Sequence, residues 1–294
     1  MKAESKFLKQ PLEFWANVKL ISQKIGYTER GTSQVKVPTF DVIQSVYKSL
    51  DLDSSKIIDS KGTPTTFGSL LIEYFQHRAT FLNYGVEPNL MNAAEAKALF
   101  NKLKKELKPK CPIPMNKQSG AKKSPAFFTG IINMLIEANS KGYDCNYDPM
   151  ELTAFTKNNF PIRSLSRRVD GCFPEVINPV AIWEIKEYYY TTTFGSRIAD
   201  GVYETLLDGL ELAEVRNAIG KNVHHYLMVD AYDTWWKQGS SYLCRICDML
   251  HMGLLDEALF GKEVVERLPE IVKEWTKQAD KKTARPTGKK KGSQ

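Results

Sequence analysis

The stretch SRRVDGCFPEVINPVAIWEIKEYYY, from Ser166 to Tyr190, combines an acidic residue, a turn and an apolar segment that carries a Glu and a Lys. Because alternate side chains of a β-strand point to opposite faces, Glu184 and Lys186 are predicted to share one face of that segment. Asp170 lies before a Cys-Phe-Pro and an Asn-Pro that break regular pairing, so a hairpin would return it beside the strand. The sequence therefore predicts that two carboxylates and one ammonium group meet.

The strand around Glu184 and Lys186 is apolar on both of its faces. Its hydrophobic side chains are Val180 and Ile182 on the face of the charged pair, and Ala181, Trp183 and Ile185 on the other. Strands covered on both sides are typical of the centre of α/β sheets. A charge buried in such a strand generally has a functional reason. The alternative is a solvated ion pair on the polar face of an amphipathic strand.

Asp170, Glu184 and Lys186 together resemble the motif of the PD-(D/E)xK nuclease superfamily, which includes the restriction endonucleases. The resemblance implies an α/β (mixed α+β) fold with a restriction-endonuclease-like core, in which helices flank a central mixed sheet. It implies that Asp170 and Glu184 hold one or two Mg²⁺ ions and that Lys186 is the catalytic lysine. Family members often have Pro before the first Asp, where this sequence has Val169.

The residue types suit phosphodiester hydrolysis independently of the family. Such a reaction needs hard oxygen ligands for Mg²⁺, which neutralises phosphate charge and lowers the pKa of a bound water. Many restriction endonucleases add a Glu from the helix before the strands, and the resemblance implies Glu137 as this third metal ligand. An equally weighted alternative places Glu137 on the polar edge of its helix. Asp200, Glu204 and Asp208 are spaced four residues apart and predict a solvated acidic helix face, with Glu204 a weaker candidate ligand.

The segments around the motif predict the order of elements that the superfamily shares. A helix is expected over Ala126–Ala138, with Ser124 as its N-cap and Pro125 at its first position. Further strands are expected at Glu151–Lys157, Ile162–Val169 and His225–Asp230, and further helices at Ser196–Val215, Ser241–Leu259 and Glu263–Lys277. In the helix from Ser196, the residues Ile198, Val202, Leu206 and Leu210 are expected to form the apolar face.

The function implied by the resemblance is that of a Mg²⁺-dependent, type II site-specific DNA endonuclease that hydrolyses double-stranded DNA. The partners implied are a second copy of the chain on a palindromic site and a cognate DNA methyltransferase of a restriction-modification system. One alternative is a phage-defence, repair or recombination nuclease of the same superfamily. The other is a non-enzymatic nucleic-acid-binding protein in which the three residues occur together by chance.

Basic residues near the motif are the expected DNA contacts. The candidates are Arg163, Arg167 and Arg168 beside Asp170, Lys122 and Lys123 before the helix at Ala126, and Arg30 and Lys36 near the N-terminus. The net charge of +7 is a weaker argument, because the tail from Asp280 carries six basic residues against one acidic residue. That tail is rich in Lys, Gly and Pro, which predicts disorder.

Three regions are expected along the 294 residues. Residues 1–110 are predicted to be helical, residues 120–278 to form the nuclease core and residues 279–294 to be the disordered basic tail, with the boundary after the first region at 108–119. Helices are expected at Leu12–Ile25, from the N-cap Thr39 to Leu50, at Thr65–Leu82 and at Asn92–Leu107. The first two resemble a helix-turn-helix unit that engages DNA, although their linker is long and a plain helical bundle is an alternative.

Composition favours a cytoplasmic protein without membrane association, and the resemblance implies that it is of prokaryotic type. No segment has the apolar length of a membrane span, and five cysteines suit a reducing compartment. Cys244, Cys247 and His251 have spacings that would place them on one helix face as zinc ligands. The surrounding sequence is apolar, which favours core cysteines instead.

Overall fold

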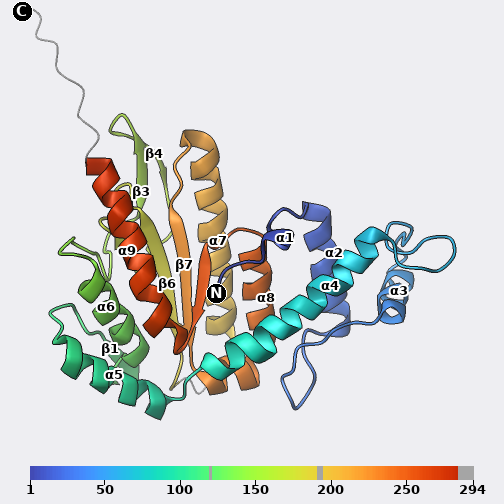
Figure 1. Cartoon of the computed structure of the whole chain (residues 1–294), viewed down its shortest axis with the longest axis horizontal. Helices are drawn as coiled ribbons and strands as arrows, with labels where there is room; N and C mark the ends of the chain where they lie inside the picture. Colours follow the sequence, from blue (N-terminus) through green and yellow to red (C-terminus); the bar gives the residue numbers. More distant parts are fainter. Residues whose placement is uncertain (119–120, 191–194, 284–294) are drawn as a thin grey trace, which may run out of the picture. The chain divides into compact units, whose positions relative to one another are not determined.

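The structure is a computed structural model that describes residues 1–118, 121–190 and 195–283, and it contains both helices and strands (Figure 1). Its contacts divide the chain into two compact units. The first unit comprises Met1–Ala93, Tyr188–Leu207 and Val229–Gly261. The second comprises Ala94–Glu187, Asp208–Met228 and the chain from Lys262. Each unit is therefore assembled from three separate segments, whereas a single boundary at 108–119 was expected.

The second unit is built on a mixed sheet. Strand β5 (Gly171–Phe173) pairs antiparallel with β6 (Ala181–Glu187), and Gly171 lies opposite Trp183. The next strand, β7 (His224–Asp230), runs parallel to β6. The two strands start side by side, where the His224 amide donates to the Val180 carbonyl. A crossover of this kind needs a long connection, which helix α7 (Ser196–Ile219) provides. From Val229 the chain belongs to the first unit, which also contains β8 (Glu257–Phe260), the strand next to β7 in the sheet order.

The two faces of β6 carry different side chains, as its alternation predicts. Ile182 packs with Leu212 and Val215 of α7 in a buried cluster, so the face of Glu184 and Lys186 is turned to that helix. On the opposite face, Trp183 stacks on Trp275, with ring centroids 5.4 Å apart and an interplanar angle of 8°. The sheet is covered on both sides, and the expected central strand is confirmed.

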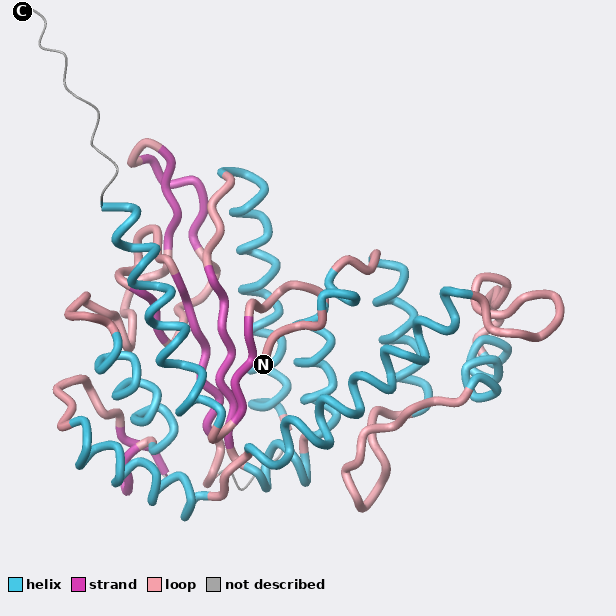
Figure 2. The backbone as a smooth tube through the Cα atoms, viewed as in Figure 1, coloured by secondary structure: helices cyan, strands magenta, loops and turns pink. Residues whose placement is uncertain are grey.

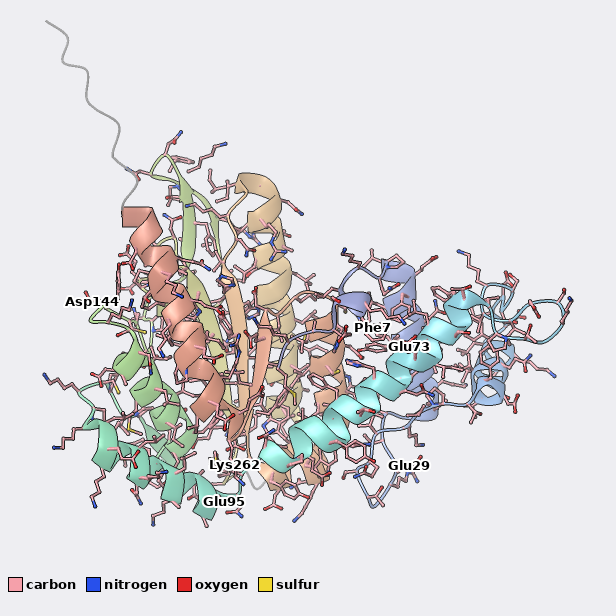
Figure 3. The ribbon with its side chains drawn as sticks, in the orientation of Figure 1. Phe7, Glu29, Glu73, Glu95, Asp144 and Lys262 are labelled. Carbon is pink, nitrogen blue, oxygen red and sulfur yellow. The ribbon has the colours of Figure 1, made fainter. Side chains whose placement is uncertain are left out.

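Helices α5 (Ala93–Leu107), α6 (Phe127–Asn139) and α9 (Glu263–Thr283) complete the second unit (Figure 2). Lys262, just before α9, forms an ion pair of 3.2 Å with Glu95 in α5 (Figure 3). The basic tail was expected from residue 279, but α9 continues to Thr283 and Ala279 is buried. The rest of that tail, residues 284–294, lies outside the described residues.

The start of α6 differs from the expectation. Ser124 and Pro125 belong to β2 (Ala121–Pro125), which pairs with β1 (Met115–Gln118), and the N-cap residue is Ala126. The helix end is satisfied instead by Glu187, whose carboxylate accepts from the Thr129 amide at 2.9 Å and from its hydroxyl at 3.0 Å. A partner 58 residues away in the chain thus replaces the local cap.

Two further expectations are corrected. The strands expected at Glu151–Lys157 and Ile162–Val169 do not join the sheet of β6, because β3 (Ala154–Lys157) and β4 (Phe160–Ser164) form a separate hairpin. Most of β4 is exposed, so it has no apolar face to add to a buried sheet. The helix expected over Ser241–Leu259 is α8 (Ser240–His251) followed by β8. It ends where Gly253 adopts a φ of 75°, a conformation that terminates helices.

The helices of the first unit pack around aromatic side chains. They are α1 (Ser5–Leu8), α2 (Leu12–Ile25), α3 (Phe40–Ser49), α4 (Thr66–Thr80), the π-helical segments Phe81–Val86 and Asp233–Gln238, the short 3-10 turn Glu87–Asn89, the first half of α7, and α8. Phe7 of α1 meets Tyr74 of α4 edge to face at 5.0 Å, and both are buried. The expected N-cap Thr39 is confirmed, since its side chain accepts from the Val42 amide, and Thr65 caps α4 in the same way by accepting from the Gly68 amide.

The segment between α2 and α3 is not a tight helix-turn-helix turn. An antiparallel bridge joins Thr28 to Val35 and turns the linker into a small hairpin. None of the helices described is both long and apolar enough to cross a membrane.

Candidate functional site

The β5–β6 hairpin brings Asp170 beside Glu184, as the sequence predicted. The amide of Asp170 donates to Glu184 Oε1 at 3.1 Å. In return, the amide of Ile185 donates to Asp170 Oδ2 at 2.7 Å. Each carboxylate is therefore held by the backbone of the other strand, which fixes both side chains at the same point of the sheet.

Glu184 and Lys186 form a buried ion pair on the face turned to α7. Glu184 is 0% exposed and Lys186 is 8% exposed. Lys186 Nζ lies 2.8 Å from Glu184 Oε2. A solvated pair on an exposed face was the alternative, and the burial of both side chains contradicts it.

Arg167 adds a second cation to Glu184. Its Nη1 and Nη2 donate to Oε1 and Oε2 of Glu184 at 2.9 and 3.0 Å, the two-pronged geometry that makes such pairs strong. Nη1 also donates to Asp208 Oδ2 at 2.7 Å. A DNA contact was expected for Arg167, but in this structure its guanidinium is engaged with two carboxylates.

Asp208 is the site residue that the sequence reasoning missed. It is 0% exposed, whereas Asp200 is exposed, so the expected solvated acidic face does not include Asp208. Its Oδ1 is buried and has no hydrogen-bond partner among the residues that the structure describes. The spacing in the sequence could have predicted this burial. Leu212 and Val215 follow Asp208 at four and seven residues, on the same helix face, and both are buried.

The apolar face of α7 rotates along the helix, which explains the error. Ile198 and Val202 are buried as expected, but Leu210 is 49% exposed. A helix turns by 3.6 residues, so a strict four-residue spacing drifts off the buried face within a few turns. The second half of α7 therefore presents Asp208 and Leu212 to the sheet, and Leu210 to solvent.

A second carboxylate of α7 anchors the loop before β5. Glu211 is 2% exposed and accepts from the Ser166 amide at 3.0 Å. It also pairs with Arg163 at 2.9 Å, and Arg163 reaches Glu214 at the same distance. These contacts hold the chain on one side of Arg167 and so help to position its guanidinium.

Asp170, Glu184 and Asp208 form a largely buried cluster with Arg167 and Lys186. The cluster holds more negative than positive charge, and the pKa values of its carboxylates reflect this. Burial, reinforced by the charge of Glu184, raises the pKa of Asp170 to about 6. Burial also raises the pKa of Asp208 to about 7, against the opposing effect of Arg167. For Glu184 burial acts in the same direction, but Lys186 and Arg167 outweigh it and lower its pKa.

Other expected site residues lie apart from this cluster. The carboxylate of Glu137 accepts from the Lys110 amide at 2.9 Å, and it forms no metal-binding group with Asp170 and Glu184. Arg168 is exposed and contacts the sulfur of Met150. The side chains of Lys122 and Lys123 on β2 lie outside the described part of the structure.

The two candidates in the first unit have different surroundings. Arg30 is exposed in the hairpin that follows α2. Lys36 is half-buried, and its ammonium donates to the Ile25 carbonyl at 3.0 Å, at the C-terminal end of α2. A cation in that position is favourable for the helix, which is a structural use of Lys36.

The donor types at the cluster fit Mg²⁺, which takes one or two carboxylates together with water. Asp170 and Glu184 supply the carboxylates, and Asp208 Oδ1 is a buried oxygen that lacks a partner. Among the described residues, no three His, Cys, Asp or Glu side chains are grouped closely enough to hold a metal ion. Arg167 occupies both oxygens of Glu184, so a metal ion at this carboxylate requires that Arg167 moves away.

The Cys-x-x-Cys segment lies in α8. Cys244 and Cys247 are fully buried, and burial raises the pKa of both thiols. His251 donates from Nδ1 to the Cys247 carbonyl at 2.8 Å, while its Nε2 lies 2.9 Å from His77 Nε2. These described side chains form no group that could hold a metal ion. The preference for core cysteines agrees with this burial.

The second unit thus has a helix-flanked mixed sheet with buried carboxylates and cations at the start of the β5–β6 hairpin. The chain belongs to the family defined as the domain of unknown function DUF7687, whose model matches residues 91–275. A second domain of unknown function, DUF7690, matches residues 1–84. No curated protein and no solved structure matches the sequence.

Proposed function

We propose that this protein is a Mg²⁺-dependent DNA endonuclease of the restriction type, which hydrolyses phosphodiester bonds of double-stranded DNA at a specific site. The observation that carries the proposal is the burial of Glu184 and Lys186 side by side, with Asp170 held opposite by two backbone hydrogen bonds. Burying Glu184 and Lys186 beside a third ionisable group, Asp170, is costly, so a chemical use is a reason to keep them.

The residues have complementary roles in such a reaction. Asp170 and Glu184 would hold Mg²⁺, which when bound neutralises phosphate charge and activates a water molecule. Lys186 keeps a cation beside Glu184 and would orient the attacking water and stabilise charge on the phosphate. Arg167 balances Glu184 and Asp208 in this structure. Released from Glu184, its guanidinium has the forked geometry that suits a phosphate group.

A second candidate is a non-enzymatic nucleic-acid-binding protein. The observation in its favour is the same contact of Arg167 with Glu184 and Asp208, because an ion-pair network of this kind can be purely structural. The two candidates differ in whether Glu184 and Lys186 are needed for a reaction.

Digestion of a defined plasmid tests the proposal. Purified protein is incubated with the plasmid in Mg²⁺, with and without EDTA, and the product ends are sequenced. We expect discrete fragments that appear only with free Mg²⁺ and disappear in Glu184→Gln and Lys186→Met. Glu137→Gln is the matched control, because Glu137 lies apart from the cluster and its loss should leave cleavage intact.

The outcomes separate the candidates. Smeared or branch-dependent products would favour a phage-defence or repair nuclease of the same superfamily. Cleavage that persists in both Glu184→Gln and Lys186→Met would contradict the assigned site, and no cleavage of any DNA would favour the binding protein. Site-specific cutting further implies a homodimer and a methyltransferase that protects host DNA, and sedimentation of the protein on a cleaved palindrome tests the dimer.

A further inference from the structure

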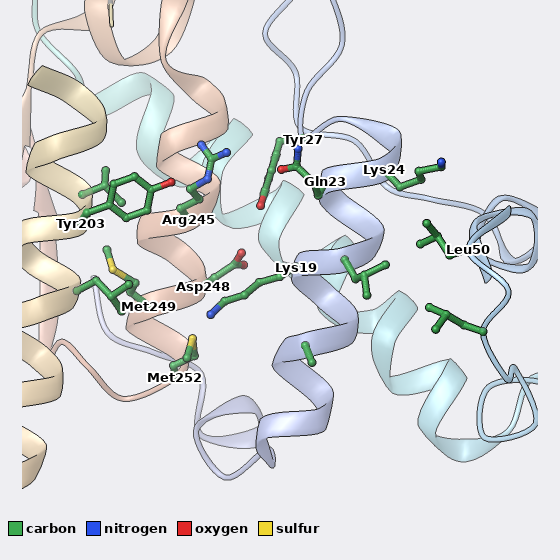
Figure 4. A pocket seen from close by; sticks show the side chains of 15 residues that line it. Lys19, Gln23, Lys24, Tyr27, Leu50, Tyr203, Arg245, Asp248, Met249 and Met252 are labelled. Carbon is green, nitrogen blue, oxygen red and sulfur yellow. The ribbon is translucent and has the colours of Figure 1, made fainter. Parts of the chain in front are cut away.

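The first unit contains a cavity that the proposed nuclease reaction does not use. Its volume is about 1000 Å³, and it lies between α2, the first half of α7 and α8 (Figure 4). This is the upper end of the volume range of small-molecule sites. Its size therefore suits an organic molecule and exceeds that of a single ion or water.

Most of the cavity wall is hydrophobic. The aliphatic and thioether side chains that line it are Ala16, Leu20, Leu50, Leu52, Val202, Leu206, Met249 and Met252. Several of them are exposed in the structure, including Leu20 at 38% and Leu52 at 43%. Covering this wall with an apolar molecule would remove hydrophobic surface from water, which is favourable.

Three cations line this apolar wall and have no counter-ion within the described part of the chain. Lys19, Lys24 and Arg245 line the cavity, and none of them forms an ion pair with another described residue. Arg245 is held in place by aromatic rings, since its guanidinium lies 4.7 Å from the ring centroids of both Tyr27 and Tyr242. Figure 4 shows Lys19 reaching from α2 toward α8, and Arg245 projecting from α8.

Asp248 is the one carboxylate among the described residues that line the cavity, and it is already neutralised. Both of its oxygens accept from Arg78 Nη1, at 3.1 and 3.2 Å, and Oδ1 also accepts from the Tyr74 hydroxyl at 2.6 Å. Arg78 and Asp248 are both almost fully buried. The charge that remains for a ligand is therefore positive.

We infer that this cavity binds a small organic anion, with an apolar body against α2, α7 and α8 and an acidic group at Lys19 and Arg245. The cations favour a ligand with an anionic group, and the hydrophobic wall favours a ligand whose remaining part is apolar. The site is a hollow among three helices, which suits a molecule free in solution. A membrane would instead require apolar side chains that project outward.

The matched probes 8-anilinonaphthalene-1-sulfonate and N-phenyl-1-naphthylamine test the inference, because they share an aromatic body and differ by the sulfonate. Fluorescence titration of the full chain should show saturable binding of the sulfonate with one site per chain, and much weaker binding of the neutral amine. In Lys19→Glu/Arg245→Glu the affinity for the sulfonate should fall about tenfold or more. Leu206→Trp should also weaken binding, because the larger side chain fills the cavity.

Two control variants distinguish binding in the cavity from effects of net charge or of an added tryptophan elsewhere. Lys9→Glu/Lys61→Glu changes net charge equally at exposed lysines outside the lining, and Leu210→Trp adds the same ring one turn further along α7. Both should bind the sulfonate as the wild type does. Equal affinity for the two probes, or unchanged affinity in Lys19→Glu/Arg245→Glu, would overturn the inference. So would binding to anionic phospholipid vesicles without binding of the free sulfonate.

Discussion

Arg167 controls the charge balance of the buried cluster. Its guanidinium is the shared partner of Glu184 and Asp208, and both of these carboxylates are 0% exposed. Buried carboxylates that lose their cation are strongly destabilising, because neither water nor another charge replaces it.

Arg167→Ala should lower the free energy of unfolding by about 3 kcal/mol, because it leaves two buried carboxylates without their shared partner. Mg²⁺ should then restore more stability to Arg167→Ala than to the wild type, since the vacated carboxylates attract a divalent cation. Urea denaturation with and without Mg²⁺ measures both effects.

The control for this prediction is the neighbouring Arg168→Ala. Arg168 is exposed, so its loss should change stability by less than about 0.5 kcal/mol. Equal destabilisation by the two variants would contradict the role given to Arg167. A Mg²⁺ effect that survives in Arg167→Ala/Glu184→Gln would place the metal elsewhere.

His251 gives the first unit a dependence on pH. It is 0% exposed, and burial lowers its pKa from 6.5 to about 4. The unfolded chain therefore binds this proton more readily than the folded chain does. The stability contributed by neutral His251 is complete above about pH 6.5 and is lost as the pH falls toward 4.

The wild type should therefore lose about 3 kcal/mol more than His251→Gln between pH 7 and pH 4. Urea unfolding of both proteins at a series of pH values measures the difference. Parallel pH profiles for the two proteins would show that His251 is not the titrating group.

The pairing of β5 with β6 depends on a close approach between the backbone of Gly171 and the indole ring of Trp183. A Cβ atom on Gly171 would lie 2.1 Å from ring atoms of Trp183, and those atoms are buried and cannot move aside easily. Only glycine allows the indole to cover the strand at this point. The strand register that places Asp170 beside Glu184 therefore requires glycine at position 171.

Gly171→Ala should destabilise the protein by about 2 kcal/mol, because the added methyl overpacks the core. Trp183→Phe removes the ring atoms in question, so the double variant Gly171→Ala/Trp183→Phe should be more stable than the sum of the single effects predicts. Thermal unfolding of the four proteins measures this coupling. Strict additivity would mean that the two residues do not compete for space.

The sequence predicted the elements with strong local signals and missed those set by distant partners. The helix Leu12–Ile25 has the expected bounds, since its apolar periodicity and Gly26 mark it locally. The cap of α6 could not be foreseen, because Glu187 reaches it across space. The strand β8 was taken for helix, because its apolar residues continue the pattern of α8 and their pairing with β7 leaves no local mark.

The candidate site was predictable in part for the same reason. Glu184 and Lys186 follow from alternation within one strand, and Asp170 follows from a hairpin. Arg167 was noted as basic, but its pairing with Glu184 and Asp208 depends on how the loop and α7 fold onto the sheet. Chain spacing alone does not determine that arrangement.

At the scale of the whole molecule, the chain returns twice to each of its compact units. The N-terminal helices of the first unit are completed by α8, where Asp248 supplies the partner of buried Arg78. Residues 1–110, expected from the sequence to be a separate helical region, therefore contain Arg78 without its counter-charge. An arginine that is almost fully buried and unpaired is not compatible with a stable core.

A fragment of residues 1–110 should therefore lack a cooperative unfolding transition and be digested rapidly by proteases, in contrast to the full chain. In the full chain, Asp248→Asn removes the same charge and should cost about 3 kcal/mol. Circular dichroism during thermal unfolding, together with limited proteolysis, measures both. A fragment that unfolds cooperatively would show that α8 is dispensable for this core.

The stacked indoles of Trp183 and Trp275 have a spectroscopic consequence. All five tryptophans lie in the described chain and are buried, but these two rings are nearly parallel and in contact. Transition dipoles held in this way couple, and the coupling vanishes when the rings separate. The near-ultraviolet circular dichroism of this protein should therefore carry an optical signature of the strand that bears Glu184, readable without a label.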